Sequence, residues 1–76
     1  NQTESMFEAL MLGLRLANGI SLSLFKQRYH IDLLAYYQER LQPFFNQGLL
    51  IIEENHLRPT SKGMDLLDFI LLELVD

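Results

Sequence analysis

The chain has 76 residues, of which 49% are hydrophobic and 21% are charged, a length and composition that suit one small globular domain. It contains no cysteine, which excludes disulfides, thiolate metal sites and cysteine ligation of an iron–sulfur cluster by this chain. Its net charge of −4 disfavours nucleic acid as a partner, because that affinity depends on neutralising phosphates.

The first predicted helix runs from about Glu4 to Ala17, and Thr3 or Ser5 is expected to cap it by accepting a backbone N–H. Its inner face repeats at helical spacing and consists of Phe7, Leu10, Met11, Leu14 and Ala17. Its opposite row carries leucines beside two charges, namely Glu8, Leu12, Arg15 and Leu16. Gly13 costs about 1 kcal/mol relative to alanine inside a helix, so we expect another backbone to approach it closely. Asn18-Gly19 is expected to end the helix in a left-handed turn.

Two further helices are predicted, with Ser21 capping Leu22–Tyr29 and Asp32 capping Leu33–Gln47. The shorter of them carries the most basic local spot, Lys26 and Arg28. In the longer one, Pro43 removes the N–H that would reach the carbonyl of Glu39. A kink or break is therefore expected near Gln42.

A β-hairpin is predicted from Leu49 to Pro59, with Asn55-His56 as its turn. Its first strand is Leu49–Glu54, which is rich in aliphatic residues. Because proline cannot donate to a ladder, the second strand, Leu57–Pro59, is expected to be an edge strand that ends there.

The last predicted helix runs from about Lys62 to Val75 and is capped by Thr60 or Ser61. Its inward positions are Gly63, Leu66, Leu67, Ile70, Leu71 and Leu74. Its outward side is not fully polar, because Phe69 and Leu72 lie there among acidic residues.

Three helices, a two-stranded wing and a closing helix follow the order of a winged helix-turn-helix domain. We therefore predict one domain over residues 1–76 that is mainly α with a small β-hairpin and is winged-helix-like. Leu33–Gln47 takes the place of the recognition helix, yet Arg40 is its only basic residue. The fold is thus predicted separately from its commonest use, and nucleic acid is not an expected partner.

Several segments resemble, in order and spacing, the C-terminal domain of the oxygen-independent coproporphyrinogen III oxidase family, radical-SAM proteins that include related haem chaperones. These segments are Glu8–Ile20, Gly48-Leu49-Leu50, Leu57-Arg58-Pro59-Thr60, and Lys62-Gly63 with Leu66-Leu67-Asp68. The strongest of them is the run from Met11 to Leu16, Met-Leu-Gly-Leu-Arg-Leu, with a glycine a few residues later.

The resemblance implies that the parent protein binds a 4Fe–4S cluster and S-adenosylmethionine on an N-terminal domain, through a three-cysteine motif that this chain lacks. Family members either oxidatively decarboxylate coproporphyrinogen III or bind haem and deliver it. The chain itself would be an accessory domain without catalytic or cofactor-binding residues, packed on that N-terminal domain and near a tetrapyrrole. The start at Asn1 without an initiator methionine fits a piece of a longer polypeptide.

Apolar side chains lie on the opposite row of the first predicted helix and on the outward side of the last one, and they give a docking hypothesis. Its candidate residues for contact with the N-terminal domain are Glu8, Leu12, Gly13, Arg15, Leu16, Phe69 and Leu72. The alternative is that these side chains close a small core from a second side, which burial would decide. A different class of function, a free-standing winged-helix module that binds DNA or protein, also stays open.

A few single residues have two interpretations each. Arg15 suits a tetrapyrrole carboxylate, or a carboxylate of a neighbouring domain or of Glu8. His56 at the hairpin tip suits haem iron or plain solvation, and His30 is interpreted as a helix-flanking residue. The methionines Met6, Met11 and Met64 are interpreted as core filling. With no leader and no apolar run of about 18 residues, a cytoplasmic protein is expected.

Overall fold

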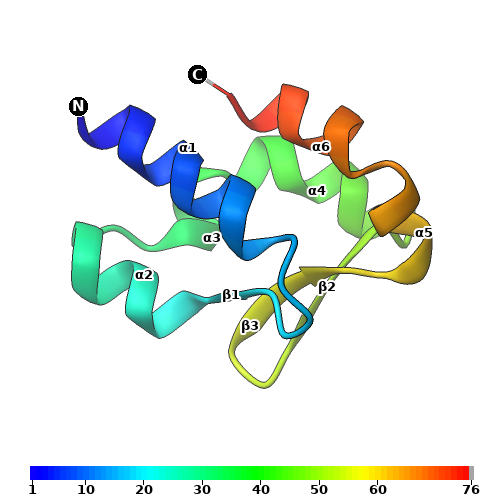
Figure 1. The fold of residues 1–76 in the computed structure, drawn as a ribbon, viewed down its shortest axis with the longest axis horizontal. Coiled ribbons are helices and arrows are strands. Elements are labelled where there is room, and N and C mark those ends of the chain that lie inside the picture. The colour runs from blue at the N-terminus through cyan, green and yellow to red at the C-terminus, as the bar shows by residue number, and fades with distance from the viewer. Residues whose placement is uncertain (76) are drawn as a thin grey trace.

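The computed structural model describes residues 1–75, in which six helices pack beside and above a small antiparallel sheet that lies at the lower edge of the view (Figure 1). The helices are α1 (Gln2–Gly13), α2 (Leu22–Tyr29), α3 (Leu33–Tyr36), α4 (Gln38–Asn46), α5 (Ser61–Asp65) and α6 (Leu67–Leu74). The strands are β1 (Ile20–Ser21), β2 (Leu50–Glu53) and β3 (His56–Pro59). The chain is therefore mainly α with a small sheet, as predicted, and is consistent with a winged-helix-like arrangement.

Helix α1 is shifted towards the N-terminus relative to its prediction. Asn1, rather than Thr3 or Ser5, caps it, in a capping box with Glu4. The helix ends at Gly13 instead of Ala17. A Cβ at Gly13 would lie 2.7 Å from Cβ of Ile20 and 3.3 Å from its Cα, so the glycine lets α1 and β1 lie this close together. The close approach expected at Gly13 is therefore confirmed.

After α1 the chain makes tighter turns before it enters the sheet. The N–H groups of Arg15 and Leu16 donate to the carbonyls three residues earlier, at 3.3 and 3.1 Å, as in a 3₁₀ helix. Gly19 then adopts a φ of +78°. The predicted left-handed turn is therefore present, but it leads into β1 and does not end the helix directly.

The sheet has the order β1-β3-β2, which corrects the predicted edge position of the second hairpin strand. Leu57 on β3 pairs with Ile20 on one side and with Ile52 on the other. Pro59 pairs only with Leu50, because β1 is two residues long and reaches no further than Leu57. The central strand tolerates its proline because β1 has no residue opposite Pro59 that would accept a backbone N–H.

The hairpin turn falls on Glu54-Asn55, one residue earlier than predicted. Both residues have positive φ values, 50° and 63°, as a type I′ turn requires. The side chain of Asn55 donates to Oγ of Ser23 at 2.8 Å, which ties the turn to α2. Glutamate is a poor residue for this conformation, because its Cβ crowds the following carbonyl.

We expect Glu54→Asn to raise the free energy of unfolding by about 0.5 to 1 kcal/mol, since asparagine tolerates the left-handed region better. The side chain of Asn55 and its bond to Ser23 are left intact by this change. Thermal unfolding would measure the effect, with Glu39→Asn on α4, at an ordinary helical position, as the control. An unchanged or lower Tm for Glu54→Asn would contradict the assignment of the turn.

The third predicted helix is broken, but not at the proline. The break falls at Tyr37 (φ −101°, ψ 12°), between α3 and α4, whereas Pro43 lies inside α4 on an exposed position. Of the kink or break expected near Gln42, the break is therefore wrong, because α4 is continuous from Gln38 to Asn46. Leu33, Tyr37 and Leu41 are each 1% exposed, so this break occurs where three successive inward side chains fill the core.

The last predicted helix is divided into α5 and α6 at Leu66. Thr60 caps α5 through a bond from the Gly63 N–H to Oγ1 at 3.1 Å, which confirms one of the two predicted caps. Leu66 was expected to point inward but is 43% exposed, because the helix changes direction at this residue. The other predicted inward positions of this segment are buried, namely Gly63, Leu67, Ile70, Leu71 and Leu74.

The core draws at least one residue from nearly every element. Met6, at 1% exposed, fills it as predicted, whereas Met64 is 44% exposed and Ala17 is also exposed, contrary to prediction. Phe7 and Met11 are half-buried against the core. Among residues 1–75 no charged side chain is buried, so every ion pair described below involves side chains that are at least partly exposed to solvent.

Candidate docking surface

The outer row of α1 and of the turn after it is exposed. Leu12 is 65% exposed and Leu16 is 61% exposed, with Glu8 and Arg15 exposed beside them. The alternative that these leucines close the core from a second side is therefore wrong. Arg15 and Leu16 lie beyond the end of α1, so the row continues from the helix into a turn.

The outer side of α6 is exposed in the same way, with Phe69 at 61% and Leu72 at 70%. Leu72 lines a groove of about 440 Å³ between α1 and α6. The other lining residues come from both helices and their ends, namely Phe7, Met11, Arg15, Asp68, Leu71 and Val75. Helices α1 and α6, which lie far apart in the sequence, thus contribute to one face of the molecule (Figure 1).

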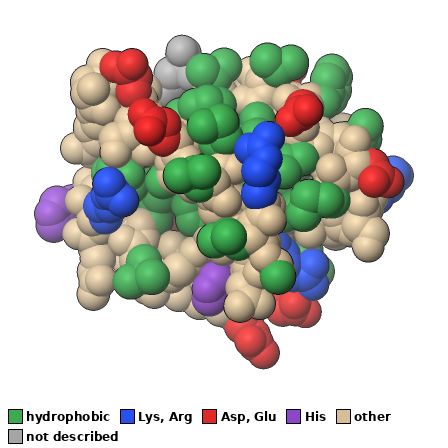
Figure 2. Space-filling model, in the orientation of Figure 1, with side chains coloured by type: hydrophobic (Ala, Val, Ile, Leu, Met, Phe, Trp, Pro, Cys, Tyr) green, Lys and Arg blue, Asp and Glu red, His purple; other side chains and the backbone are tan. Residues whose placement is uncertain are grey.

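We define the docking surface as the exposed apolar side chains of α1, α5 and α6 and of the residues that directly follow or join these helices: Leu12, Leu16, Met64, Leu66, Phe69, Leu72 and Val75. Figure 2 shows hydrophobic side chains gathered around a central basic one on this side of the molecule, with acidic side chains among and beside them. From the sequence, Met64 was interpreted as core filling and Leu66 as an inward position, so neither was expected on this surface. Large exposed apolar patches of this kind mark sites of interaction in soluble proteins.

A second groove, of about 700 Å³, continues the surface around α1 towards α2. Leu12 and Leu16 line one side of it, and Leu24, which is 64% exposed, lines the other. Gly13 is buried at its floor and packs against Ile20, so its role is to let α1 approach β1. Leu24 was not predicted as a surface residue of interest.

Arg15 sits between the two helices of the docking surface and binds both. Its Nη1 donates to the carbonyl oxygen of Met11 at 3.0 Å, and its Nη2 donates to Oδ1 of Asp68 at 3.2 Å. The predicted pairing with Glu8 is replaced by this pair with Asp68. The side chain of Asp68 is 94% exposed, so the bond is a surface ion pair and contributes at most about 1 kcal/mol to the free chain.

The segment in the place of a recognition helix does not present a basic side chain to solvent for DNA. Arg40 donates from Nη1 to the carbonyl of Leu74 at 3.2 Å, and its guanidinium lies 4.8 Å from the ring centre of Tyr37. The segment is also divided into two short helices, and its exposed charges include Glu39. These contacts hold α4 against the end of α6.

The two histidines lie apart, His30 at the end of α2 and His56 at the start of β3, directly after the hairpin turn. His30 follows α2 with a φ of 58°, and its N–H donates to the carbonyl of Lys26, so it terminates that helix. Nδ1 of His56 lies 2.8 Å from the carbonyl oxygen of Glu54. Within residues 1–75 no three acidic, histidine or cysteine side chains lie close enough together to hold a metal ion.

No helix within residues 1–75 has both the length and the apolar character needed to cross a membrane.

A family model described as the HemN C-terminal domain matches residues 1–66. The matched range contains α1, the sheet and α5, and it covers most of the 76 residues. Neither the curated proteins nor the solved structures gave a match to the chain. The match confirms the resemblance predicted from the run Met11–Leu16 and the segments that follow it.

Proposed function

The chain belongs to the HemN C-terminal domain family, and from this premise we propose that it is an accessory domain that docks on the N-terminal radical-SAM domain of its parent protein. The parent would resemble the oxygen-independent coproporphyrinogen III oxidase or a related haem chaperone. A 4Fe–4S cluster and S-adenosylmethionine would be held by that N-terminal domain, since the present chain has no cysteine to ligate a cluster.

The observation that carries this proposal is the exposure of large apolar side chains on two neighbouring helices. Leu12 on α1 and Phe69 and Leu72 on α6 each expose more than 60% of their surface, and Leu72 lines the groove between the two helices. Each fully buried side chain of this size contributes about 1.5 to 3 kcal/mol when it leaves water. A domain of a larger protein recovers this free energy when it docks, and a C-terminal domain has such a partner in its own polypeptide.

In this role the chain would supply shape and position, with no reactive group of its own. Docking would cover the apolar face, exclude water from the junction of the two domains and fix the wall that this domain presents to the tetrapyrrole. A tetrapyrrole, including haem, would then be a ligand of the whole protein. Whether the protein oxidises coproporphyrinogen III or delivers haem depends on the N-terminal domain.

We expect Leu12→Asp and Phe69→Asp each to weaken binding of the chain to the separately produced N-terminal domain by about tenfold to a hundredfold. The reason is that each change places a carboxylate in an interface that must become dry. Isothermal titration calorimetry would measure the dissociation constants. The matched control is Ala35→Asp. Ala35 is exposed on α3 and lines neither groove of the surface, so this variant should bind like the unmodified chain.

Equal affinities for all three variants would contradict the docking role. Two further measurements separate the finer alternatives. Haem titration of the full-length protein, compared with its turnover of coproporphyrinogen III, distinguishes chaperone from oxidase. Tight and salt-sensitive retention of the chain on duplex DNA would instead favour a free-standing DNA-binding module.

A further inference from the structure

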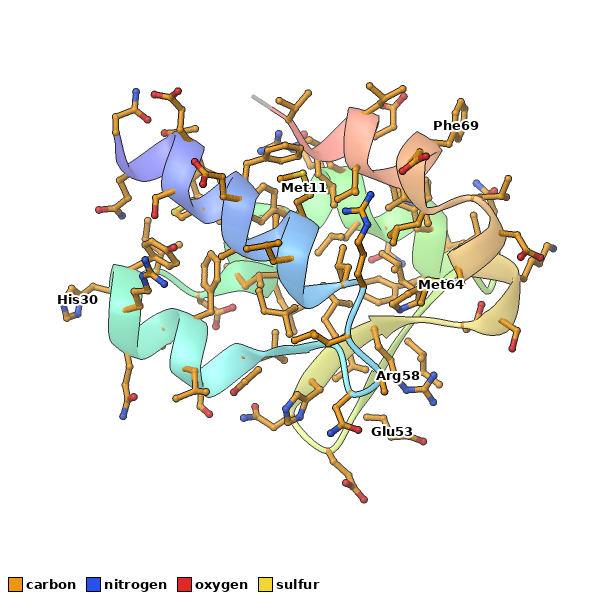
Figure 3. The ribbon with its side chains drawn as sticks, viewed as in Figure 1. Met11, His30, Glu53, Arg58, Met64 and Phe69 are labelled. Carbon is orange, nitrogen blue, oxygen red and sulfur yellow. The ribbon has the colours of Figure 1, made fainter. Side chains whose placement is uncertain are left out.

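A hollow of about 590 Å³ lies at the corner where α5 turns into α6, at the edge of the docking surface. Its lining residues are Arg15, Met64, Asp65, Leu66, Leu67, Asp68 and Phe69. In Figure 3, Phe69 projects outward from α6, and Met64 lies on α5 on the other side of this corner. The hollow therefore combines exposed apolar walls with three charged side chains.

The charges of the hollow do not balance. Arg15 brings one positive charge, and its guanidinium already binds Asp68 and the Met11 carbonyl. Asp65 and Asp68 bring two carboxylates, so the formal charge of the lining is −1. The chain as a whole carries −4, so no general excess of positive charge offsets this local one. A partner that covers the hollow must supply hydrogen-bond donors to these carboxylates, because a buried carboxylate without donors is strongly unfavourable.

We propose that the hollow receives an arginine or lysine side chain from the N-terminal domain, an inference that rests on the proposed docking. The apolar walls suit the aliphatic stem of such a side chain, which packs along apolar surface while its charged end stays with polar groups. The ring of Phe69, 61% exposed, also offers a face to a cation. The charged end would lie between Asp65 and Asp68, opposite the bond that Arg15 makes.

A second copy of the chain suits this surface less well. In a symmetric dimer the same patch supplies both sides of the interface, so the carboxylates of the hollow and the exposed Glu8 and Glu73 would be brought together from both copies. Like charges brought together in this way oppose association. These acidic side chains therefore favour a partner with the opposite charge over self-association.

The test uses Asp65→Asn, which leaves the Arg15–Asp68 pair intact, and the double variant with Asp68→Asn. Binding to the N-terminal domain is measured at about 50 mM and about 500 mM salt, where screening lengths differ severalfold. We expect about tenfold weaker binding for Asp65→Asn at low salt, a larger loss for the double variant, and little remaining salt dependence. Glu54→Gln, at the exposed hairpin tip, removes the same charge elsewhere and is the control.

The outcomes separate this inference from the docking role itself. If Phe69→Asp abolishes binding while the asparagine variants bind like the unmodified chain at both salt concentrations, the proposed arginine or lysine in the hollow is wrong. The docking role is then still supported. If no variant changes binding, both are wrong. If the unmodified chain dimerises in sedimentation and Phe69→Asp makes it monomeric, the surface belongs to a second copy and the inference is overturned.

Discussion

Gly63→Ala is expected to destabilise the chain by about 3 kcal/mol or more, because the added methyl group has no space. A Cβ at this position would overlap the carbonyl oxygen of Leu49 and lie 2.8 Å from the carbonyl carbon. That carbonyl cannot move away freely, since it accepts the N–H of Thr60 at 3.0 Å. The Gly63 N–H in turn donates to Oγ1 of Thr60, so the clash disturbs the cap of α5 as well.

A neighbouring glycine provides the control for this prediction. Gly48 has a φ of +71°, and nothing lies within 4 Å of the place where its Cβ would be. Gly48→Ala should therefore lower the free energy of unfolding only by the cost of placing alanine in the left-handed region, about 1 to 2 kcal/mol. Urea unfolding followed by circular dichroism would compare the two variants. A Gly63→Ala variant no less stable than Gly48→Ala would contradict the close packing of α5 on the carbonyl of Leu49.

Local signals predicted much of the fold. Helix α2 has its predicted bounds, because Ser21 is a strong N-cap whose side chain accepts from the Leu24 N–H and because the apolar spacing that follows is short and clear. The cap of α3 by Asp32 is confirmed for the same reason. Side chains that bond to the backbone a few residues away are legible in a sequence, since both partners lie within one turn.

Features that depend on distant segments were not predictable in this way. Strand β1 has two residues and exists because Ile20 and Ser21 pair with Leu57 and His56, more than thirty residues later. Its presence makes β3 the central strand, which is why the edge position assigned from Pro59 is wrong. The breaks in the third and last predicted helices likewise follow from packing, since Tyr37 is 1% exposed where the first of them falls.

The same division holds for the docking surface. The unusual leucines of the first predicted helix were visible as a second apolar row, because helical spacing alone places Leu12 and Leu16 away from the core. The partner of Arg15 was not visible, since Asp68 lies 53 residues further along the chain. Met64 and Leu66 became part of the surface only through the turn between α5 and α6, where a continuous helix had been predicted.

Helix α1 offers a sharp comparison between the two kinds of apolar side chain. Leu10 is 0% exposed and Leu12 is 65% exposed, although both belong to the same short helix. Leu10→Ala should lower the free energy of unfolding by about 2 to 5 kcal/mol, because it removes buried methyl groups and leaves a cavity. Leu12→Ala should change it by no more than about 0.5 kcal/mol. A domain of this size is stable by only about 5 to 10 kcal/mol, so the first change removes a large share.

The two substitutions are expected to reverse their order when binding is measured in place of stability. Leu12→Ala removes part of the surface that meets the N-terminal domain, so it should weaken docking severalfold while the chain stays folded. Leu10→Ala should leave docking unchanged under conditions where the variant is still folded, because the side chain faces the core of its own domain. Urea unfolding and titration calorimetry on the same two proteins test this crossover. Parallel effects in both measurements would mean that α1 has one functional face, the one towards the core, and that its outer leucines carry no partner.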